Sequence, residues 1–482
     1  MTKKLGYIPK EERKNILLLC DDIRMHSGIA TMAREIVIGT SHRYNWFNVG
    51  AAIKHPDSGK VLDLSGDVNK KMNLEDADVK VMPNNGYGDS NLLRNLLKQF
   101  DFDGIMIFTD PRYWEWLFRI EREVRTKLPI FYLNIWDNYP APLYNKQYYR
   151  SVDLLMAISK QTANINRVVL GEEAKDKIIN YVPHGIDETT FYPIKQDSEE
   201  FNTFKEFKKS TLKGIDYEFI VFFNSRNIHR KHVGDSILAY QNFCDLIGKE
   251  KAKKCAFILH TQALDNNGTD LKAVKHALTD SEYVNIFFSQ EKISPPQMNM
   301  LYNLADVTML LSSNEGWGLA LTESMMSGTM IAANVTGGMQ DQMRFVDEDG
   351  KWIDFTPEFP SNHRGTYKEC GEWAMPIFPN NISLAGSPKT PYIFDDRCSP
   401  EDAAQALLRV YEMNNEERKA NGLKGREWAT SSESNMSSKR MCDNVIKSLD
   451  QAINNYIPRS KYDIIKVEDN KIEKVQHKLT GY

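Results

Sequence analysis

The stretch that decides the fold is Leu311–Gly328, which reads LSSNEGWGLALTESMMSG. The apolar run Asp306–Leu311 leads into it and predicts a buried strand. Gly316 and Gly318 predict a tight turn, and the residues from there to Gly328 predict a helix. A strand, a glycine turn and a helix in this order bring backbone N–H groups and the positive end of a helix to one place. The stretch therefore predicts an anion-binding site within an α/β domain.

Two glutamates flank this turn. Glu315 precedes it, and Glu323 follows eight residues later, about one helical turn into the predicted helix. With a diphosphate on the helix end, one carboxylate on each side could accept hydrogen bonds from sugar hydroxyls. The alternative is an ordinary strand-loop-helix connection that carries two solvated glutamates.

Strand and helix patterns alternate on both sides of this stretch, and a polar segment interrupts them once. Short apolar runs separated by amphipathic helices favour parallel sheets that are covered on both faces. The sequence therefore predicts an α/β fold of two doubly wound, Rossmann-like domains that face a central cleft. The expected boundaries are residues 1–192 for the first domain, 193–216 for an interdomain linker, 217–430 for the second domain, and 431–482 for C-terminal helices that pack back toward the first domain.

Residues 351–393 break the rhythm of the second domain. They are rich in Pro, Gly, Asn and aromatic residues, and they show no clear periodicity. A segment of this length and composition inside a compact domain predicts an elaborated loop with a functional role.

Composition limits the class of protein. The 482 residues are 41% hydrophobic and 26% charged with a net charge of −4, which is typical of a folded chain and excludes a chain-wide basic surface for nucleic acid. No apolar run reaches the roughly 18–20 residues that span a bilayer, and no signal peptide is expected. The six cysteines are scattered, which favours reduced thiols in the cytoplasm.

A pair of cations follows the first strand of the second domain. Arg226 and Lys231 lie five residues apart after the apolar run 219–224. Because a leaving nucleoside diphosphate gains negative charge, fixed cations beside it stabilise the transition state more than the ground state. The alternative is two surface cations at the start of a helix. His229, Arg230 and His232 are expected to be solvated.

The first domain offers three residues whose roles the sequence leaves open. Gly28, in His26-Ser27-Gly28, could let a donor phosphate approach or could simply begin a helix. Asp137 follows the apolar run 129–135 and could bind the sugar or take the acceptor proton, and otherwise it caps a turn. Asp110 is a second such carboxylate. No metal ion is expected, because Asp101-Phe102-Asp103 precedes a strand instead of following one.

Four segments together resemble the retaining GT-B glycosyltransferases of family four, also called group 1. Glu315 to Glu323 resembles that family's signature of a Glu, seven residues and a Glu around a Gly-x-Gly-Leu turn. The other three segments are DLLMAIS at 153–159, VPHGID at 182–187 and LYNLADVT at 301–308. The resemblance covers about residues 153–346 and resumes from 395 to the last helices. Gly337 and Gly338 resemble the family's next glycine turn, which is either a plain turn or a ligand contact.

The resemblance implies a sugar transfer from a nucleotide-diphosphate sugar, UDP-linked, to an acceptor hydroxyl with retention of configuration and without a metal ion. The residues expected to be catalytic are Asp137, Arg226, Lys231 and Glu315. The residues expected to bind the donor are Gly28, Arg226, Lys231, Gly316, Trp317, Gly318, Leu319 and Glu323. Many family members carry a histidine near position 137, so its absence here leaves the acceptor-side chemistry open.

The acceptor is open between a glycan, a lipid and a hydroxymethylated DNA base. The glycine turn and the 351–393 segment resemble variants carried by bacterial viruses, in which DNA modification would fit. The alternatives to a transferase are a glycoside phosphorylase on the same fold and a non-catalytic subunit that binds nucleotide sugars. The complete set of Arg226, Lys231, Glu315 and Glu323 argues against the latter.

Overall fold

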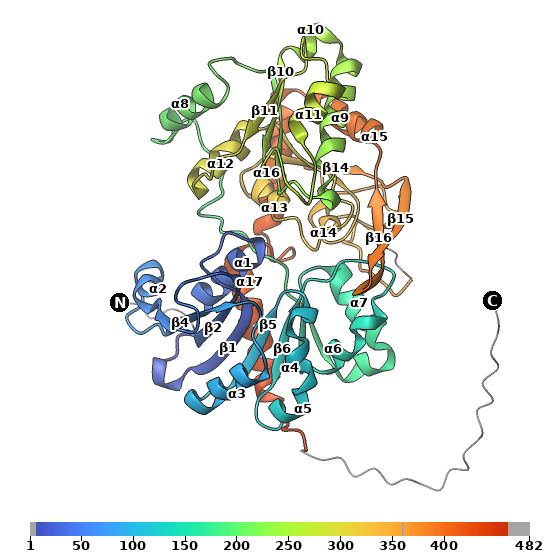
Figure 1. Cartoon of the computed structure of the whole chain (residues 1–482). Helices are drawn as coiled ribbons and strands as arrows, with labels where there is room; N and C mark the ends of the chain where they lie inside the picture. The colour runs from blue at the N-terminus through green and yellow to red at the C-terminus, as the bar shows by residue number, and fades with distance from the viewer. Residues whose placement is uncertain (1–5, 359–360, 461–482) are drawn as a thin grey trace, which may run out of the picture.

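The computed structural model describes residues 6–358 and 361–460, and it contains two α/β domains, one below the other in Figure 1. The predicted pair of Rossmann-like domains is confirmed, because each domain has its own mainly parallel sheet with helices on its faces. The predicted C-terminal segment extends to residue 482, and its part from 461 onward lies outside the described residues.

The first domain is built on an eight-stranded sheet with the order β3-β4-β2-β1-β5-β6-β7-β8. All neighbouring strands are parallel except β3 and β4. The strands are β1 (Lys14–Asp21), β2 (Tyr44–Ile53), β3 (Leu62–Asp63), β4 (Val79–Asn85), β5 (Gly104–Phe108), β6 (Ile130–Asn134), β7 (Leu154–Ala157) and β8 (Ile178–Tyr181). The helices are α1 (Gly28–Thr40), α2 (Ser65–Met72), α3 (Ser90–Gln99), α4 (Glu115–Arg119), α5 (Glu121–Val124), α6 (Lys146–Arg150) and α7 (Lys160–Leu170), with short 3-10 turns that include η2 (Pro111–Trp114).

The second domain has a six-stranded parallel sheet with the order β11-β10-β9-β12-β13-β14. The strands are β9 (Phe219–Asn224), β10 (Cys255–His260), β11 (Ile286–Ser289), β12 (Val307–Leu310), β13 (Met330–Asn334) and β14 (Ala374–Ile377). The helical segments are η5 (His229–Lys231), α9 (Val233–Ile247), α10 (Lys249–Ala252), α11 (Leu271–Leu278), α12 (Pro295–Leu304), α13 (Leu319–Met326), α14 (Met339–Met343), α15 (Pro400–Glu412) and α16 (Asn415–Thr430).

Two segments are more structured than the sequence indicates. The expected linker contains helix α8 (Phe201–Thr211), whose Phe204 and Phe207 pack against buried residues of the second domain. The 351–393 segment contains β14 and most of a hairpin, β15 (Asn381–Ser387) and β16 (Thr390–Arg397). Pro376 lies in β14, and an edge strand tolerates it because the missing N–H bond faces outward.

The β15–β16 hairpin reaches from the second domain to the first (Figure 1). The Phe394 N–H donates to the carbonyl of Tyr139 at 2.6 Å, and the Tyr144 hydroxyl donates to the carbonyl of Tyr392 at 3.2 Å. The Tyr144 and Tyr392 rings also meet edge to face, with centroids 5.0 Å apart. The hairpin therefore bridges the two domains.

Helix α17 (Ser438–Asn454) returns to the first domain and packs on α1. Asp450 accepts hydrogen bonds from the Tyr44 hydroxyl at 2.6 Å and from Arg43 at 2.7 Å. The chain thus crosses between the domains twice, and the crossings touch. The Ile186 N–H donates to the Met436 carbonyl at 3.0 Å, and the Ser438 N–H donates to the Ile186 carbonyl at 3.0 Å.

In the described residues, no helix combines the length and the apolar composition needed to cross a bilayer.

Candidate active site

The glycine turn that the sequence singled out joins β12 to α13. Gly318 begins α13 in the left-handed region, with φ of +88°, and no side chain among the described residues caps this helix end. The Leu321 N–H donates to the Gly318 carbonyl at 2.9 Å, and the N–H groups of Leu319 and Ala320 are left at the helix end for an anion. Gly337 and Gly338 pack closely against the backbone of this turn. A Cβ on Gly337 would lie 2.1 Å from the Glu315 carbonyl oxygen, and the Gly338 N–H donates to that oxygen at 3.0 Å.

Glu315 accepts bonds from two cations at the mouth of this turn. Arg230 Nη1 lies 3.0 Å from Glu315 Oε2, and it also donates to the Asn314 carbonyl at 2.8 Å. Lys231 Nζ donates to the same Glu315 oxygen. The Lys231 and Glu315 side chains are only 9% and 12% exposed, so water screens this pair little.

The pKa values of the pair reflect both burial and charge. Burial alone would raise the pKa of Glu315, but the charges of Lys231 and Arg230 outweigh it and lower the pKa to about 2. Burial lowers the pKa of Lys231 to about 8, although Glu315 acts in the opposite direction. The charge of Arg230 also contributes to the lowered pKa of Lys231. Glu315 is thus fixed as an anion, and Lys231 is a cation near neutral pH.

The structure does not bring Arg226 to this cluster. Its Nε donates to Asp265 Oδ2 at 2.7 Å, and its side chain is 62% exposed. Arg230, which was expected to be solvated, is 41% exposed and also contacts Glu315, so it joins the cluster. The physical reason is the η5 turn, which places Arg230 beside Lys231 while the loop after β10 supplies a carboxylate for Arg226. The contact of Arg226 with the donor stays a prediction.

Glu323 lies further along α13, in a different environment. Its Oε2 accepts a hydrogen bond from the Tyr302 hydroxyl at 2.6 Å, and that hydroxyl accepts one from Asn224 Nδ2 at 2.9 Å. Burial raises the pKa of Glu323. A carboxylate held by one phenol keeps acceptor sites for further hydroxyl groups.

Asp137 approaches the cluster from the first domain. It follows β6, and Arg230, Glu315 and Lys231 all contribute to its electrostatic surroundings. Burial raises the pKa of Asp137 to about 7, with Arg230 acting against the rise and Glu315 adding to it. Asp137 is therefore close enough to Lys231, Glu315 and Arg230 to feel their charges, and its catalytic role stays a prediction.

The two domains touch at the glycines. A Cβ on Gly316 would lie 3.0 Å from the carbonyl oxygen of Ile135, just before Asp137. A Cβ on Gly28 would lie 3.5 Å from Leu319 Cδ1, so the first turns of α1 and α13 face each other. Ser27 caps α1 by accepting from the Ala30 N–H at 3.0 Å. Gly28 thus begins a helix, which was one of its two expected roles, and its contact with a donor stays a prediction.

Trp317 is placed differently from the other predicted binding residues. Its side chain is 2% exposed, and its Nε1 donates to Thr322 Oγ1 at 2.9 Å. The indole therefore belongs to the core, and a donor could meet only the backbone of this residue.

Sequence reasoning missed the pairing of Asp110 with Arg112. Asp110 caps η2 by accepting from the Arg112 N–H at 3.0 Å, and its carboxylate also binds the Arg112 guanidinium, with Nε at 2.8 Å. An aspartate followed two residues later by an arginine is the only sequence signal for this pair.

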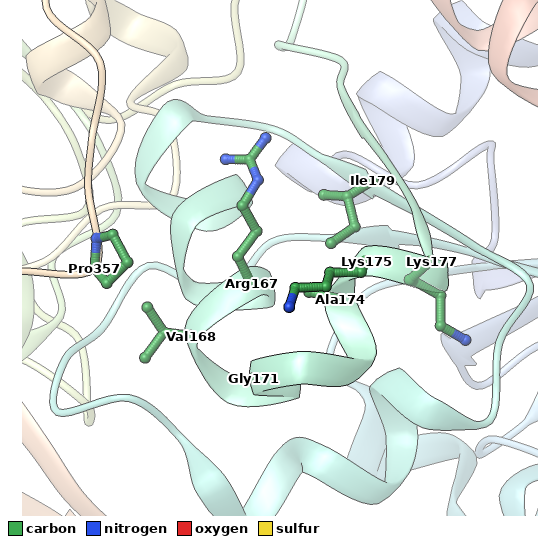
Figure 2. Close-up of a pocket in the computed structure, with 8 residues that line it drawn as sticks. All are labelled: Arg167, Val168, Gly171, Ala174, Lys175, Lys177, Ile179 and Pro357. Carbon is green, nitrogen blue, oxygen red and sulfur yellow. The ribbon is translucent and has the colours of Figure 1, made fainter.

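A separate hollow of about 590 Å³ lies beside α7 (Figure 2). Arg167, Lys175 and Lys177 line it together with Pro357. None of the predicted site residues lines this hollow, so it is distinct from the cluster around Glu315. In the described residues, His, Cys, Asp and Glu side chains form no group of three or more that could hold a metal ion.

Residues 203–354 match the family model of glycosyl transferases group 1. No curated protein matches the chain. A glycosyltransferase from Rickettsia africae is similar in structure, with a TM-score of 0.61 and 12% identity over 92% of this chain and 100% of that chain. HepE from Anabaena, solved with UDP and glucose, has a TM-score of 0.60 and 13% identity over 91% of this chain and 100% of its own. Sucrose-phosphate synthase from Thermosynechococcus elongatus has a TM-score of 0.56 and 13% identity over 92% and 97%. These likenesses show the GT-B glycosyltransferase fold.

Proposed function

We propose that this chain is a glycosyltransferase that moves a sugar from a nucleotide-diphosphate sugar to an acceptor hydroxyl with retention of configuration. The observation that carries the proposal is the meeting of Arg230, Lys231 and Glu315 with Asp137 at the start of α13. Cations and a free helix end suit a diphosphate that leaves, and carboxylates suit hydroxyl groups.

The donor-side chemistry follows from charge. As the bond between sugar and diphosphate breaks, negative charge grows on the diphosphate, and Lys231, Arg230 and the N–H groups of α13 are already in position to stabilise it. We propose that these groups do the work of a metal ion, so that none is required. Glu323 is proposed to hold hydroxyl groups of the donor, because its remaining lone pairs are free to accept.

The acceptor-side chemistry follows from Asp137. A carboxylate whose pKa is about 7 can take a proton near neutral pH and can then release that proton to water. We propose that Asp137 accepts a hydrogen bond from the acceptor hydroxyl or takes its proton while the hydroxyl attacks on the face that the diphosphate leaves. This role replaces the histidine that the resembling family often carries.

The nucleotide is proposed to be UDP. The support is by likeness only: HepE was solved with UDP and glucose, and similar structures include a UDP-forming trehalose-phosphate synthase from Burkholderia xenovorans. We further propose a cytoplasmic location, which agrees with six cysteines that are all free thiols.

The experiment is a panel of nucleotide sugars incubated with the protein, with release of nucleoside diphosphate measured with and without acceptors. Slow release without acceptor and faster release with one are expected. Glycans, lipids and hydroxymethylated DNA serve as acceptors, and mass spectrometry of the products detects the added sugar. Release of sugar phosphate from a glycan and inorganic phosphate would instead support a phosphorylase. Tight nucleotide-sugar binding without any turnover would support a binding subunit and refute the proposal.

A further inference from the structure

We propose that the edge of the first sheet carries an acceptor subsite that binds a ring of a neutral carbohydrate, with Tyr113 as the stacking residue. The inference rests on the proposed function, because a transferase needs an acceptor opposite its donor. It goes further by naming the acceptor class and the residue that selects it.

The position of the subsite follows from the sheet order. Strands β1, β5 and β6 are neighbours and parallel, so their carboxyl ends meet at one edge. Strand β1 ends at Asp21, and β5 and β6 are followed within three residues by Asp110 and Asp137. Asp137 is the member that reaches the donor-domain cluster. The other two extend the same edge away from it, where the rest of an acceptor would lie.

An aromatic platform stands beside these carboxylates. The Tyr87 and Tyr113 rings are stacked with centroids 4.2 Å apart and planes 8° apart. Two tryptophans fix Tyr87 in place. The Trp114 ring meets the Tyr87 ring edge to face, with centroids 5.5 Å apart, and Trp116 Nε1 donates to the Tyr87 carbonyl at 3.1 Å. Tyr113 is 49% exposed. A large aromatic ring that is stacked on one face and about half exposed is suited to stack on a flat ligand ring.

The platform belongs to the same edge as the aspartates. Asp110 lies in the turn that carries Tyr113, whose N–H donates to the Asp110 carbonyl at 3.2 Å. Burial raises the pKa of Tyr87 to about 12, and the charges of Asp21 and Asp110 add to this rise. Thr109, which links β5 to Asp110, has φ of +132°, an unusual value for a β-branched residue. The backbone is thus held in a strained form just where it turns toward Tyr113.

The hairpin of the second domain closes the far side. Arg112 Nη1 donates to the Lys389 carbonyl at 3.2 Å, and its guanidinium lies 5.6 Å from the centre of the Trp136 ring. Trp136 in turn meets Tyr144, which contacts Tyr392 of β16. The edge is therefore bounded by Tyr113 on one side and by the hairpin on the other.

Charge selects the carbohydrate over DNA. The arginines that follow β1 and β5 are both engaged, Arg24 with Asp22 at 2.7 Å and Arg112 with Asp110. A DNA backbone needs cations that are free to replace its counterions. An edge whose two arginines are each neutralised by a carboxylate, next to an aromatic ring, instead matches a neutral sugar, whose C–H groups can stack on the ring and whose hydroxyl groups carry no charge.

The test uses binding as well as catalysis. The full chain, saturated with UDP, is applied to an array of neutral glycans and to a duplex that contains 5-hydroxymethylcytosine. Binding to at least one class of glycan is expected. Tyr113→Ala should weaken it at least tenfold, and Tyr113→Phe, which keeps the ring, should restore it. Phe201→Ala on α8 is the control for loss of an aromatic ring outside the subsite.

In turnover assays with the glycan found, Tyr113→Ala should raise the acceptor KM at least tenfold and the donor KM much less. Absence of glycan binding, binding indifferent to Tyr113→Ala, or preference for the DNA duplex would overturn the inference. Failure of the proposed function has a different signature, because glycan binding would persist while no nucleotide sugar releases its diphosphate.

Discussion

Alanine variants of Lys231, Arg230 and Arg226 should differ in activity in the order of the burial of these side chains. Lys231→Ala removes a charge that is 9% exposed and bonded to Glu315, in a place where water screens little. By analogy with other preorganised charge stabilisers, its loss should cost about 2.7–4 kcal/mol of transition-state stabilisation, or about 10²–10³-fold in kcat.

The two arginines should behave differently from each other. Arg230 is 41% exposed and donates to Glu315, and a hydrogen bond to a charged group contributes about 1.5–3 kcal/mol before screening, so Arg230→Ala should cost about tenfold. Arg226 is 62% exposed and paired with Asp265, and such surface pairs contribute about 0–1 kcal/mol. Arg226→Ala should therefore change kcat less than about fivefold.

The assay is steady-state release of nucleoside diphosphate at pH 7.5 with the donor identified from the panel. Thermal unfolding of each variant serves as the control, so that a loss of folded protein is not read as a loss of catalysis. The reasoning would be refuted if Arg226→Ala lost as much activity as Lys231→Ala while Arg230→Ala kept that of the parent. In that case Arg226 would have to leave Asp265 for the donor, as the family resemblance implies.

Three further predictions concern pH and packing. The kcat/KM should rise as pH passes about 7, where Asp137 loses its proton, and fall above about 8, where Lys231 loses its charge, so a flat profile from about pH 6 to 9 would contradict both roles. Gly337→Ala should lower the free energy of unfolding by about 1–3 kcal/mol in urea titrations, because its Cβ would lie 2.1 Å from the Glu315 carbonyl oxygen, and an unchanged midpoint would argue against this packing. Burial raises the pKa of Asp341 in the folded protein to about 7 from an ordinary value of 3.8, so the folded state loses stability as pH rises between these two values. Asp341→Asn should therefore be more stable than the parent at pH 8 by more than about 1 kcal/mol, with a smaller gain at pH 5, and an equal effect at both would count against the burial argument.

The sequence predicted the fold because the fold depends on local patterns. Apolar runs and glycine turns identify strands and their carboxyl ends, and a parallel sheet brings those ends to one edge. The patterns indicated that Asp137, Lys231 and Glu315 follow strands, and the family resemblance implied that they share one site. The direction in which a side chain points depends on partners from distant parts of the chain, which local patterns do not reveal.

Arg226 and Arg230 show why the remainder was missed. They lie four residues apart in one loop, and their partners, Asp265 and Glu315, come from distant parts of the chain. Residue spacing does not reveal which carboxylate each arginine will meet. Strand β14 and the β15–β16 hairpin were missed for a related reason. Their polar and apolar residues alternate only weakly, and Pro376 and the loop-like composition of the segment hide that pattern.

The contact between Ile186 and Ser438 has a mechanical consequence. Two connections that run side by side and are bonded to each other form one joint link between the domains, and the β15–β16 hairpin adds a separate contact between them. A protease cut in one connection would leave the halves tethered through the second. After cuts in both, only non-covalent contacts such as those of the β15–β16 hairpin would hold the domains together.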